Sequence, residues 1–213
     1  YSRQQRRLLE LLRMPKAVLL DLGGVVLGIN VAQVFQTWAA RASVEPDHFK
    51  HRWVMDEAYE LHEIGAIDFA EYVRRQGQHF DIDMPLTDWQ DGWNAIWTEP
   101  YAQVVTLLPK LANRYELFAF SNTNAVHAES FCSRYPETLA HFDKLFLSHE
   151  VGARKPHAAA FIRVCDQINA QPRDVLFIDD SAENVQGALS AGLDAHHLYK
   201  EQDIATKLRQ LLD

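Results

Sequence analysis

The sequence predicts an α/β protein with a doubly wound parallel sheet and an inserted all-helical domain. Three observations support this fold class: five short apolar runs have the length of buried strands, helical patterns lie between most of them, and one long gap carries helix signals alone. Parallel strands need a crossover between them, and a helix usually provides it. The alternation therefore indicates a sheet covered by helices on both faces.

The predicted strands share a nearly continuous apolar character, which is typical of a sheet buried on both sides. They cover residues 17–20, 117–120, 144–147, 175–178 and 195–199. Apolar residues at helical spacing predict a helix over 101–113, and the same period returns over 161–168. A further helix is expected over 182–191, with Ser181 as its N-cap and Gly192 in the C-terminal capping position.

The gap between the first two strands is too long for a single crossover. Residues 30–100 contain about four helical patterns and no persuasive strand, so an inserted helical domain is expected there. Asp68 and Thr87 have the positions of N-caps. The three tryptophans Trp89, Trp93 and Trp97 fall on one helical face, which predicts a packed stripe.

The expected organisation is thus a main domain over 16–29 and 101–213, with the helical domain at 30–100 and a basic amphipathic helix at 1–15. A formal net charge of −8 argues against a nucleic-acid binder with a basic surface. The two cysteines, Cys132 and Cys165, form no C-x-x-C pair, so neither a disulfide framework nor a thiolate zinc site is indicated and a reducing cytoplasm is expected. No run reaches the roughly 20 apolar residues of a membrane span, so stable membrane insertion is not expected.

Polar residues follow the predicted strands at four places. Asp21 ends the first strand, Ser121 the second, Lys155 lies in "GARKPHAAAF", and Asp179 and Asp180 end the strand in "VLFIDDS". In open parallel sheets the carboxyl ends of the strands form the ligand crevice. These side chains are therefore expected to share one site.

Three carboxylates in one crevice repel each other unless a cation lies among them. Asp21, Asp179 and Asp180, completed by the backbone carbonyl of Gly23, suit Mg²⁺, which prefers a few oxygen ligands and retains water. The Ser121 hydroxyl, backbone N–H groups around Asn122 and the Lys155 ammonium would then hold a phosphate. Asp21 would attack phosphorus and form an aspartyl-phosphate that water hydrolyses.

These motifs resemble those of the haloacid dehalogenase-like hydrolase superfamily, subfamily I with a helical C1 cap. They occur in order as "LLDLGGVV", "FAFSNTN", "ARKP" and "FIDDSAENVQGA", and the likeness covers about residues 16–200. Within the superfamily the chain is most similar to the bacterial α-D-glucose-1-phosphate phosphatase branch, which shares these motifs and a stretch like "HEIGAIDFAEY". The resemblance implies a Rossmann-like sheet of order 5-4-1-2-3, with residues 30–100 as the cap.

One position departs from the superfamily pattern. Most of its phosphatases carry a second aspartate two residues after the nucleophile as general acid and base, and here that residue is Gly23. General acid–base assistance is worth about 10²–10⁴ in rate. Three explanations are open: a less basic leaving group such as an anomeric sugar oxygen, a substitute donor such as His127, Asn124 or a cap residue, or lost chemistry with retained ligand binding.

The expected function is a cytoplasmic, Mg²⁺-dependent phosphatase acting on a small phosphorylated metabolite, such as the sugar phosphate glucose 1-phosphate. One alternative is a metal-independent 2-haloacid dehalogenase, in which the same aspartate attacks carbon. The other is a degenerate domain that only binds a phosphometabolite. The acidic pair Asp179 and Asp180 argues against the dehalogenase, because attack without a metal gains nothing from added negative charge.

Overall fold

The computed structural model describes residues 14–213, so the basic helix expected at 1–15 lies outside the described residues in all but its last two positions. The main sheet has five parallel strands in the order β5-β4-β1-β6-β7. From one edge to the other these are β5 (Lys144–Leu147), β4 (Glu116–Ser121), β1 (Ala17–Leu20), β6 (Val175–Asp179) and β7 (Asp194–His197). All five predicted strands are present, with ends that differ by up to two residues.

A second, antiparallel pair of strands was not predicted. It joins β2 (Leu27–Ile29) to β3 (Trp97–Pro100). Both strands are very short, and β3 pairs with a strand far back in the chain, so neither local pattern nor turn chemistry signals them. Numbered along the whole chain, the main-sheet order therefore differs in detail from the expected 5-4-1-2-3, while β1 still lies directly between β4 and β6.

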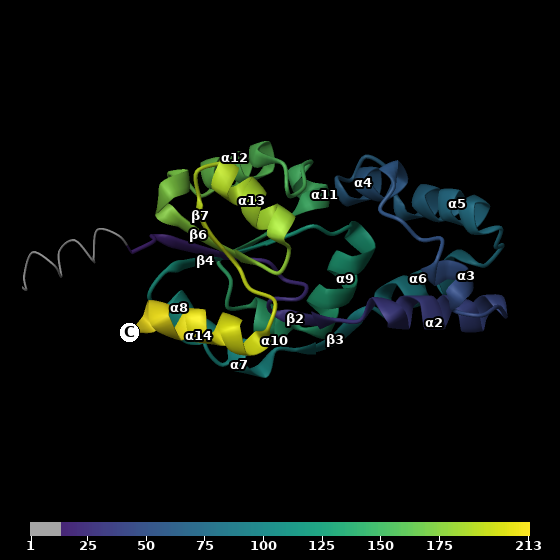
Figure 1. Cartoon of the computed structure of the whole chain (residues 1–213), viewed down its shortest axis with the longest axis horizontal. Coiled ribbons are helices and arrows are strands. Elements are labelled where there is room, and N and C mark those ends of the chain that lie inside the picture. The colour runs from purple at the N-terminus through teal and green to yellow at the C-terminus, as the bar shows by residue number, and fades with distance from the viewer. Residues whose placement is uncertain (1–13) are drawn as a thin grey trace, which may run out of the picture.

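Helices cover both faces of the main sheet (Figure 1). One face carries α7 (Ala102–Val105), α8 (Leu108–Ala112), α9 (Ala125–Arg134), α10 (Pro136–Leu139) and α14 (Glu201–Leu212). The other carries α12 (Ala158–Gln167) and α13 (Ala182–Ser190), with α11 (Ser148–Val151) at the end of β5 and the 3₁₀ turn η1 (Pro172–Asp174) before β6. None of the helices described between residues 14 and 213 is long and apolar enough to cross a membrane.

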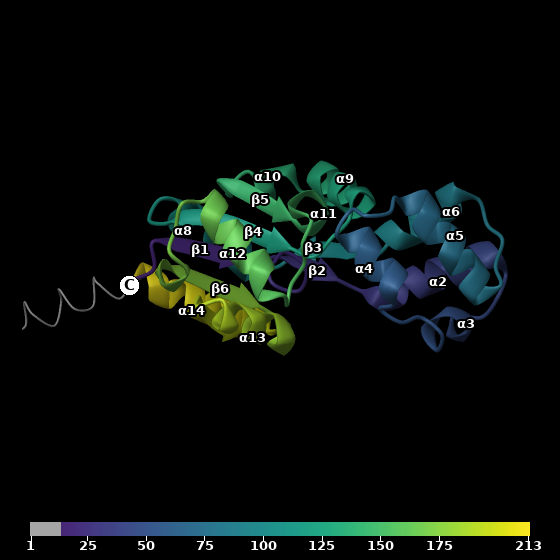
Figure 2. The same cartoon turned by 90° about the horizontal axis from the view of Figure 1, so that it is seen from above.

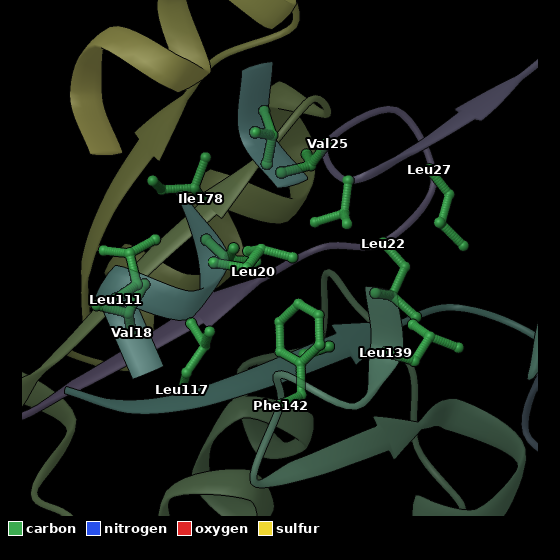
Figure 3. Close-up of a cluster of buried hydrophobic side chains, with 14 of the residues drawn as sticks. Val18, Leu20, Leu22, Val25, Leu27, Leu111, Leu117, Leu139, Phe142 and Ile178 are labelled. Carbon is green, nitrogen blue, oxygen red and sulfur yellow. The ribbon is translucent and has the colours of Figure 1, made fainter. Parts of the chain in front are cut away.

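The residues of β1 alternate between two buried clusters. Val18 and Leu20 pack with Leu111 and Ile178 on the α8 and α14 side, as Figure 3 shows. Ala17 and Leu19 face the α12 and α13 side instead. All residues of β1 are fully buried, so this strand fixes the level at which the next residue, Asp21, leaves the sheet.

The helical segment 31–94 has a hydrophobic core of its own. Its helices, called here the α2–α6 bundle, are α2 (Val31–Ala42), α3 (Asp47–Lys50), α4 (Glu57–Glu63), α5 (Phe69–Phe80) and α6 (Leu86–Asn94). Their core is aromatic: the Trp38 ring stacks on Trp93 and meets Trp89 edge-on. Figures 1 and 2 both show the bundle at the end of the molecule opposite the C-terminus.

The helix signals in this segment were correct in part. Asp68 caps α5 by accepting a hydrogen bond from the Glu71 N–H, and Ser181 caps α13 in the same way. Thr87 is not an N-cap, because α6 begins one residue earlier, after Pro85. Trp97 does not extend the helical stripe, since it begins β3. The helix expected over 101–113 is two short helices, with Pro109 in the first turn of the second.

Helix α13 approaches the loop after Lys155 so closely that only glycine fits at position 187. A Cβ atom there would lie 1.9 Å from the Pro156 carbonyl oxygen, which is backbone and has little freedom to move. We expect Gly187→Ala to lower the free energy of unfolding by about 1–3 kcal/mol, because this overlap outweighs the better helix propensity of alanine. Urea denaturation measures the change. Gln186→Ala, at the exposed neighbouring position, is the control and should stay within about 0.5 kcal/mol of wild type; equal effects of the two substitutions would contradict the close contact.

Candidate active site

Three carboxylates meet where β1 and β6 end. Asp21 follows β1, and its backbone N–H donates to the Ile178 carbonyl of β6 over 2.9 Å, so the two strand ends are tied together. One oxygen each from Asp21, Asp179 and Asp180 lies within 4.8 Å of the others. Ser121, the last residue of β4, ends the strand on the other side of β1. The predicted acidic residues are thus gathered at one edge of the sheet.

A single lysine lies within this acidic group. Lys155 is fully buried, and its Nζ is 2.6 Å from Asp179 Oδ2 and 3.0 Å from Asp21 Oδ1. The aromatic rings of Phe120 and Phe177 lie 5.5 Å and 5.3 Å from the ammonium, which gives a favourable cation–π arrangement. The lysine is therefore held in place on several sides.

The side chain of Asn122 holds the backbone of Lys155. Its Nδ2 donates to the Lys155 carbonyl and its Oδ1 accepts from the Lys155 N–H, both over 2.9 Å. The sequence predicts that backbone N–H groups around Asn122 bind phosphate. The structure adds a second role, because this amide fixes the loop that carries the lysine.

The two adjacent aspartates differ in their surroundings. Asp179 is fully buried and accepts hydrogen bonds from the Ser181 N–H and from Asn184 Nδ2, in addition to its ion pair with Lys155. Asp180 is half-buried and forms no salt bridge with any residue between 14 and 213. Asp179 is therefore suited to orienting Lys155. Asp180 has fewer partners and is better suited to bind a metal ion.

Gly24 allows the β1 turn to pass close to Asp180. Its φ of +79° lies in the left-handed region, and a Cβ atom there would be 2.2 Å from Asp180 Oδ2. Gly23, the predicted carbonyl ligand, is different, since its backbone is outside that region. A side chain at Gly23 would face Ile29 Cγ2 at 3.3 Å and the Trp97 ring at 3.8 Å. The backbone itself therefore does not demand glycine at position 23.

Burial and neighbouring charges shift the pKa values of Asp21, Asp180 and Lys155. Burial raises the pKa of Asp21 to about 8, although the nearby Lys155 ammonium opposes this, and Asp179 and Asp180 raise it further. Burial and the Asp179 carboxylate also raise the pKa of Asp180. Burial by itself lowers the pKa of Lys155, but the carboxylates of Asp179 and Asp21 outweigh it and hold that pKa above its usual value.

The group carries more negative than positive charge, and its donors are hard oxygens. Three carboxylates face one ammonium, so a divalent cation would neutralise the excess and keep Asp21 deprotonated. Carboxylate oxygens together with a backbone carbonyl and water are the ligands that Mg²⁺ prefers. The residues present therefore fit a magnesium ion, with Asp21 and Asp180 as the carboxylates best placed to hold it.

His127 was a candidate acid or base, and its surroundings favour a structural role. Its Nε2 lies 3.0 Å from the Trp93 carbonyl, which can only accept, so that nitrogen carries the proton. Its Nδ1 faces the Asn124 amide, and its ring stacks on Trp93 at 4.8 Å. Burial lowers the pKa of His127 to about 3. The neutral ring thus joins α9 to α6, and Asn124 serves as the N-cap of α9.

Three residues that support the site were not predicted from the sequence. Asn184, the third residue of α13, binds Asp179, and the motif "DDSAEN" contains the signal, because a polar side chain in the first turn of a helix can reach back past the N-cap. Ser148 and Arg154 contact the α2–α6 bundle from the core. Their partners lie in a different part of the chain, so no local pattern reveals these contacts.

Comparison with known proteins identifies the family. The family model of the haloacid dehalogenase-like hydrolases matches residues 15–192, and the chain belongs to this family. A D-ribitol-5-phosphate phosphatase from Bacteroides thetaiotaomicron is 21% identical over 207 residues, which cover 94% of this chain and all of that protein.

Two solved structures share the fold. A HAD family enzyme from Bacteroides thetaiotaomicron, solved as a magnesium complex, is 25% identical with a TM-score of 0.76, over 87% of this chain and 93% of that one. A predicted HAD-like hydrolase from Porphyromonas gingivalis is 22% identical with a TM-score of 0.81, over 94% of this chain and 99% of that one. The similarity therefore includes the α2–α6 bundle as well as the sheet.

The acidic group predicts a pH-dependent response to magnesium. The pKa of Asp21 is raised in the folded protein, so its stabilising contribution is complete below its unfolded pKa and is lost as pH rises through about 8. Magnesium should offset that loss, because it favours the deprotonated carboxylate. We expect the rise in melting temperature on adding MgCl₂ to be larger at about pH 8 than at about pH 5. Differential scanning fluorimetry measures it, and Asp180→Asn should reduce the rise; a pH-independent rise that Asp180→Asn leaves unchanged would contradict this site.

Proposed function

We propose that the protein is a Mg²⁺-dependent phosphatase that hydrolyses a small phosphorylated metabolite, a sugar phosphate, through an aspartyl-phosphate on Asp21. The observation that carries the proposal is the placement of one nucleophile-type carboxylate, Asp21, against a buried lysine and two further carboxylates. A carboxylate in such a setting attacks phosphorus only when positive charge offsets its repulsion with the phosphate oxygens. Lys155 supplies part of that charge.

The residues of the site have separate roles in this reaction. A carboxylate oxygen of Asp21 forms a bond to phosphorus while the bond from phosphorus to the leaving oxygen breaks, and that oxygen takes a proton from water. A second water then attacks phosphorus, the bond from phosphorus to the Asp21 oxygen breaks, the proton of the attacking water passes to solvent, and inorganic phosphate leaves with the Asp21 carboxylate restored. Ser121, Lys155 and the backbone at Asn122 hold the phosphate oxygens. Asp179 and Asn184 keep Lys155 oriented.

Magnesium would supply charge neutralisation for the phosphate and for the carboxylates. Asp21, Asp180 and the Gly23 carbonyl would hold it, with Asp179 contributing directly or through water. The magnesium complex of the 25% identical HAD family enzyme supports this choice of ion. The acidic pair also favours a phosphatase over a dehalogenase, because additional carboxylates hinder attack by Asp21 when no metal is present.

We propose further that residues 30–100 act as a cap over the site in the main domain, 16–29 and 101–213, and select the substrate. Three buried polar groups support this: Trp93 Nε1, His62 Nδ1 and Thr123 Oγ1 find no hydrogen-bond partner within residues 14–213. They belong to the segments that meet at the boundary, since Trp93 stacks on His127 and the residue after His62 contacts Ser148. Unsatisfied polar groups beside aromatic rings suit the hydroxyls and the apolar face of a sugar.

The substrate class rests on the relatives. The D-ribitol-5-phosphate phosphatase acts, by its name, on a phosphorylated sugar alcohol, and the sequence resembles the glucose-1-phosphate phosphatase branch. A phosphorylated small molecule, rather than nucleic acid, also fits the net charge of −8. Both cysteines are free thiols, which supports the cytoplasmic setting we propose.

Hydrolysis of p-nitrophenyl phosphate and a panel of sugar phosphates, with and without MgCl₂, tests the function. We expect Mg²⁺-dependent phosphate release that Asp21→Asn lowers by about 10⁴-fold or more, because the nucleophile is lost. Asp166→Asn, at an exposed position on α12, is the control and should match wild type. Failure to release phosphate from any of these compounds would contradict the proposed phosphatase activity. Chloride release from a 2-haloacid without metal would instead show that the protein is a dehalogenase.

Substitutions at position 23 test whether the absence of a second aspartate limits the rate of turnover. A Cβ atom at position 23 would lie 3.3 Å from Cγ2 of the exposed Ile29, a contact that a shift of a few tenths of an ångström relieves, so the backbone is expected to accept Gly23→Asp. We expect up to about 10²-fold faster turnover of alkyl phosphates, whose leaving groups need a proton, and little gain on p-nitrophenyl phosphate. Gly23→Asn has the same size without the acid and is the matched control. Equal kcat values for the two variants on alkyl phosphates would show that proton donation is not what limits the wild type.

A further inference from the structure

The loop that carries Lys155 is bound directly to the α2–α6 bundle. Arg154, the residue before the lysine, donates from Nε to Glu63 Oε2 over 2.7 Å and from Nη1 to Glu60 Oε1 over 2.9 Å. Both acids belong to α4. Within residues 14–213, all salt bridges of Arg154 are therefore made to the bundle, and none to the domain in which Arg154 itself lies.

The two ion pairs differ in burial. The Glu63 side chain is 4% exposed and Arg154 is 13% exposed, whereas Glu60 is 54% exposed. An exposed pair contributes about 0–1 kcal/mol, but a buried carboxylate that loses its partner is strongly unfavourable. Burial does raise the pKa of Glu63, and Arg154 opposes that rise. Glu63 is therefore the acid for which contact with Arg154 matters most.

A second contact lies beside the first. The fully buried Ser148 hydroxyl lies 2.6 Å from the Glu63 carbonyl and 2.8 Å from the Thr123 carbonyl, and it accepts from the Thr123 N–H. Thr123 lies next to Asn122 in the loop that follows β4. One serine thus joins the end of α4 to the loop after β4.

Backbone contact closes the same region. Gly65 has a φ of +72°, and a Cβ atom there would lie 2.5 Å from the His149 carbonyl oxygen. The turn after α4 therefore packs against the backbone of α11. Figures 1 and 2 both show α4 as the part of the bundle that faces α11. We call the contacts of Glu63, Gly65, Ser148 and Arg154 the α4 junction.

We propose that Glu63 is a positioning residue, and that the α4 junction couples contact of the bundle with the core to the placement of Lys155. The catalytic part of this inference rests on the proposed phosphatase function. Glu63 can bind Arg154 only when α4 lies against the loop. Arg154 is covalently next to Lys155, whose backbone N–H and carbonyl both bind the Asn122 side chain. Loss of the junction therefore removes one of two supports of the lysine loop and leaves the Asn122 contacts as the other.

A buried ion pair is a poor source of stability on its own, because desolvation offsets most of the attraction. The Glu63–Arg154 ion pair instead contributes a defined geometry, because the planar guanidinium fixes the angle and distance between α4 and the loop. Displacement of a substrate-holding group by about 1 Å can lower a rate by about 10²-fold. Glu63→Gln removes the buried carboxylate and leaves Arg154 its exposed partner Glu60, so this substitution is expected to affect turnover more than folding.

Steady-state kinetics with two matched variants tests the catalytic part. Glu63→Gln keeps the shape and removes the charge, and we expect kcat on p-nitrophenyl phosphate to fall by about 10- to 100-fold. Glu60→Gln removes the exposed partner of the same arginine and should change kcat less than about twofold. The magnesium-induced rise in melting temperature should be the same in both. Equal kcat values for the two variants would overturn the role of Glu63.

The conservative and double variants separate positioning from general damage. Arg154→Lys retains the charge and should lose less kcat than Arg154→Gln. The double variant Glu63→Gln/Arg154→Gln should be no slower than Arg154→Gln alone, because both changes remove one interaction. Additive losses in kcat would show that the two residues act separately, and would contradict the junction.

Hydrogen exchange of the ligand-free protein tests the coupling without any activity. We expect Glu63→Gln to increase exchange in two segments, 57–65 over α4 and the turn after it and 152–157 around Lys155, and to leave α14 unchanged. An increase confined to α4 would overturn the coupling. If the wild type hydrolysed no phosphate ester but exchange rose in both segments, the proposed function would fail while the junction would stand.

Discussion

The buried ammonium of Lys155, with its two ion pairs, is the group on which the rest of the site depends. It lies between Asp21 and Asp179 at the ends of two neighbouring strands, and removal of its charge would leave carboxylates facing each other in a buried place. Much of the surrounding structure serves to keep it there. The Asn122 amide binds its backbone, the rings of Phe120 and Phe177 lie beside its charge, and Gly187 lets α13 approach the following proline.

The same constraint explains what the sequence could and could not predict. The strand bearing Asp21 is a continuous apolar run with a polar residue at its end, so its position and the meeting of Asp21, Asp179 and Asp180 followed from local pattern and sheet geometry. The β2–β3 pair and the Arg154 contacts depend on residues far apart in the chain. A local sequence pattern therefore does not predict them. Trp97 illustrates the limit, because its spacing matched a helical stripe while its backbone is part of β3.

Adjacent residues of the site differ in their contacts and in the roles that these contacts suit. Asp179 binds Lys155, the Ser181 N–H and Asn184, whereas Asp180 forms no salt bridge within residues 14–213 and offers one oxygen to the carboxylate group. Asn122 contributes a side chain to the lysine loop, and Arg154 carries that loop's connection to α4. The α2–α6 bundle thus contacts the Lys155 loop through Arg154, and we propose that motion of the bundle is coupled to the site through this contact.

Direct observation of the covalent intermediate tests the central claim. Wild-type protein mixed with Mg²⁺ and a substrate that it hydrolyses, then quenched in acid and analysed by peptide mass spectrometry, should carry one added phosphoryl group on the peptide that contains Asp21. Treatment with hydroxylamine should remove that group, since an acyl phosphate is cleaved by this nucleophile. A phosphoryl group on another residue, or full turnover by Asp21→Asn, would contradict the account.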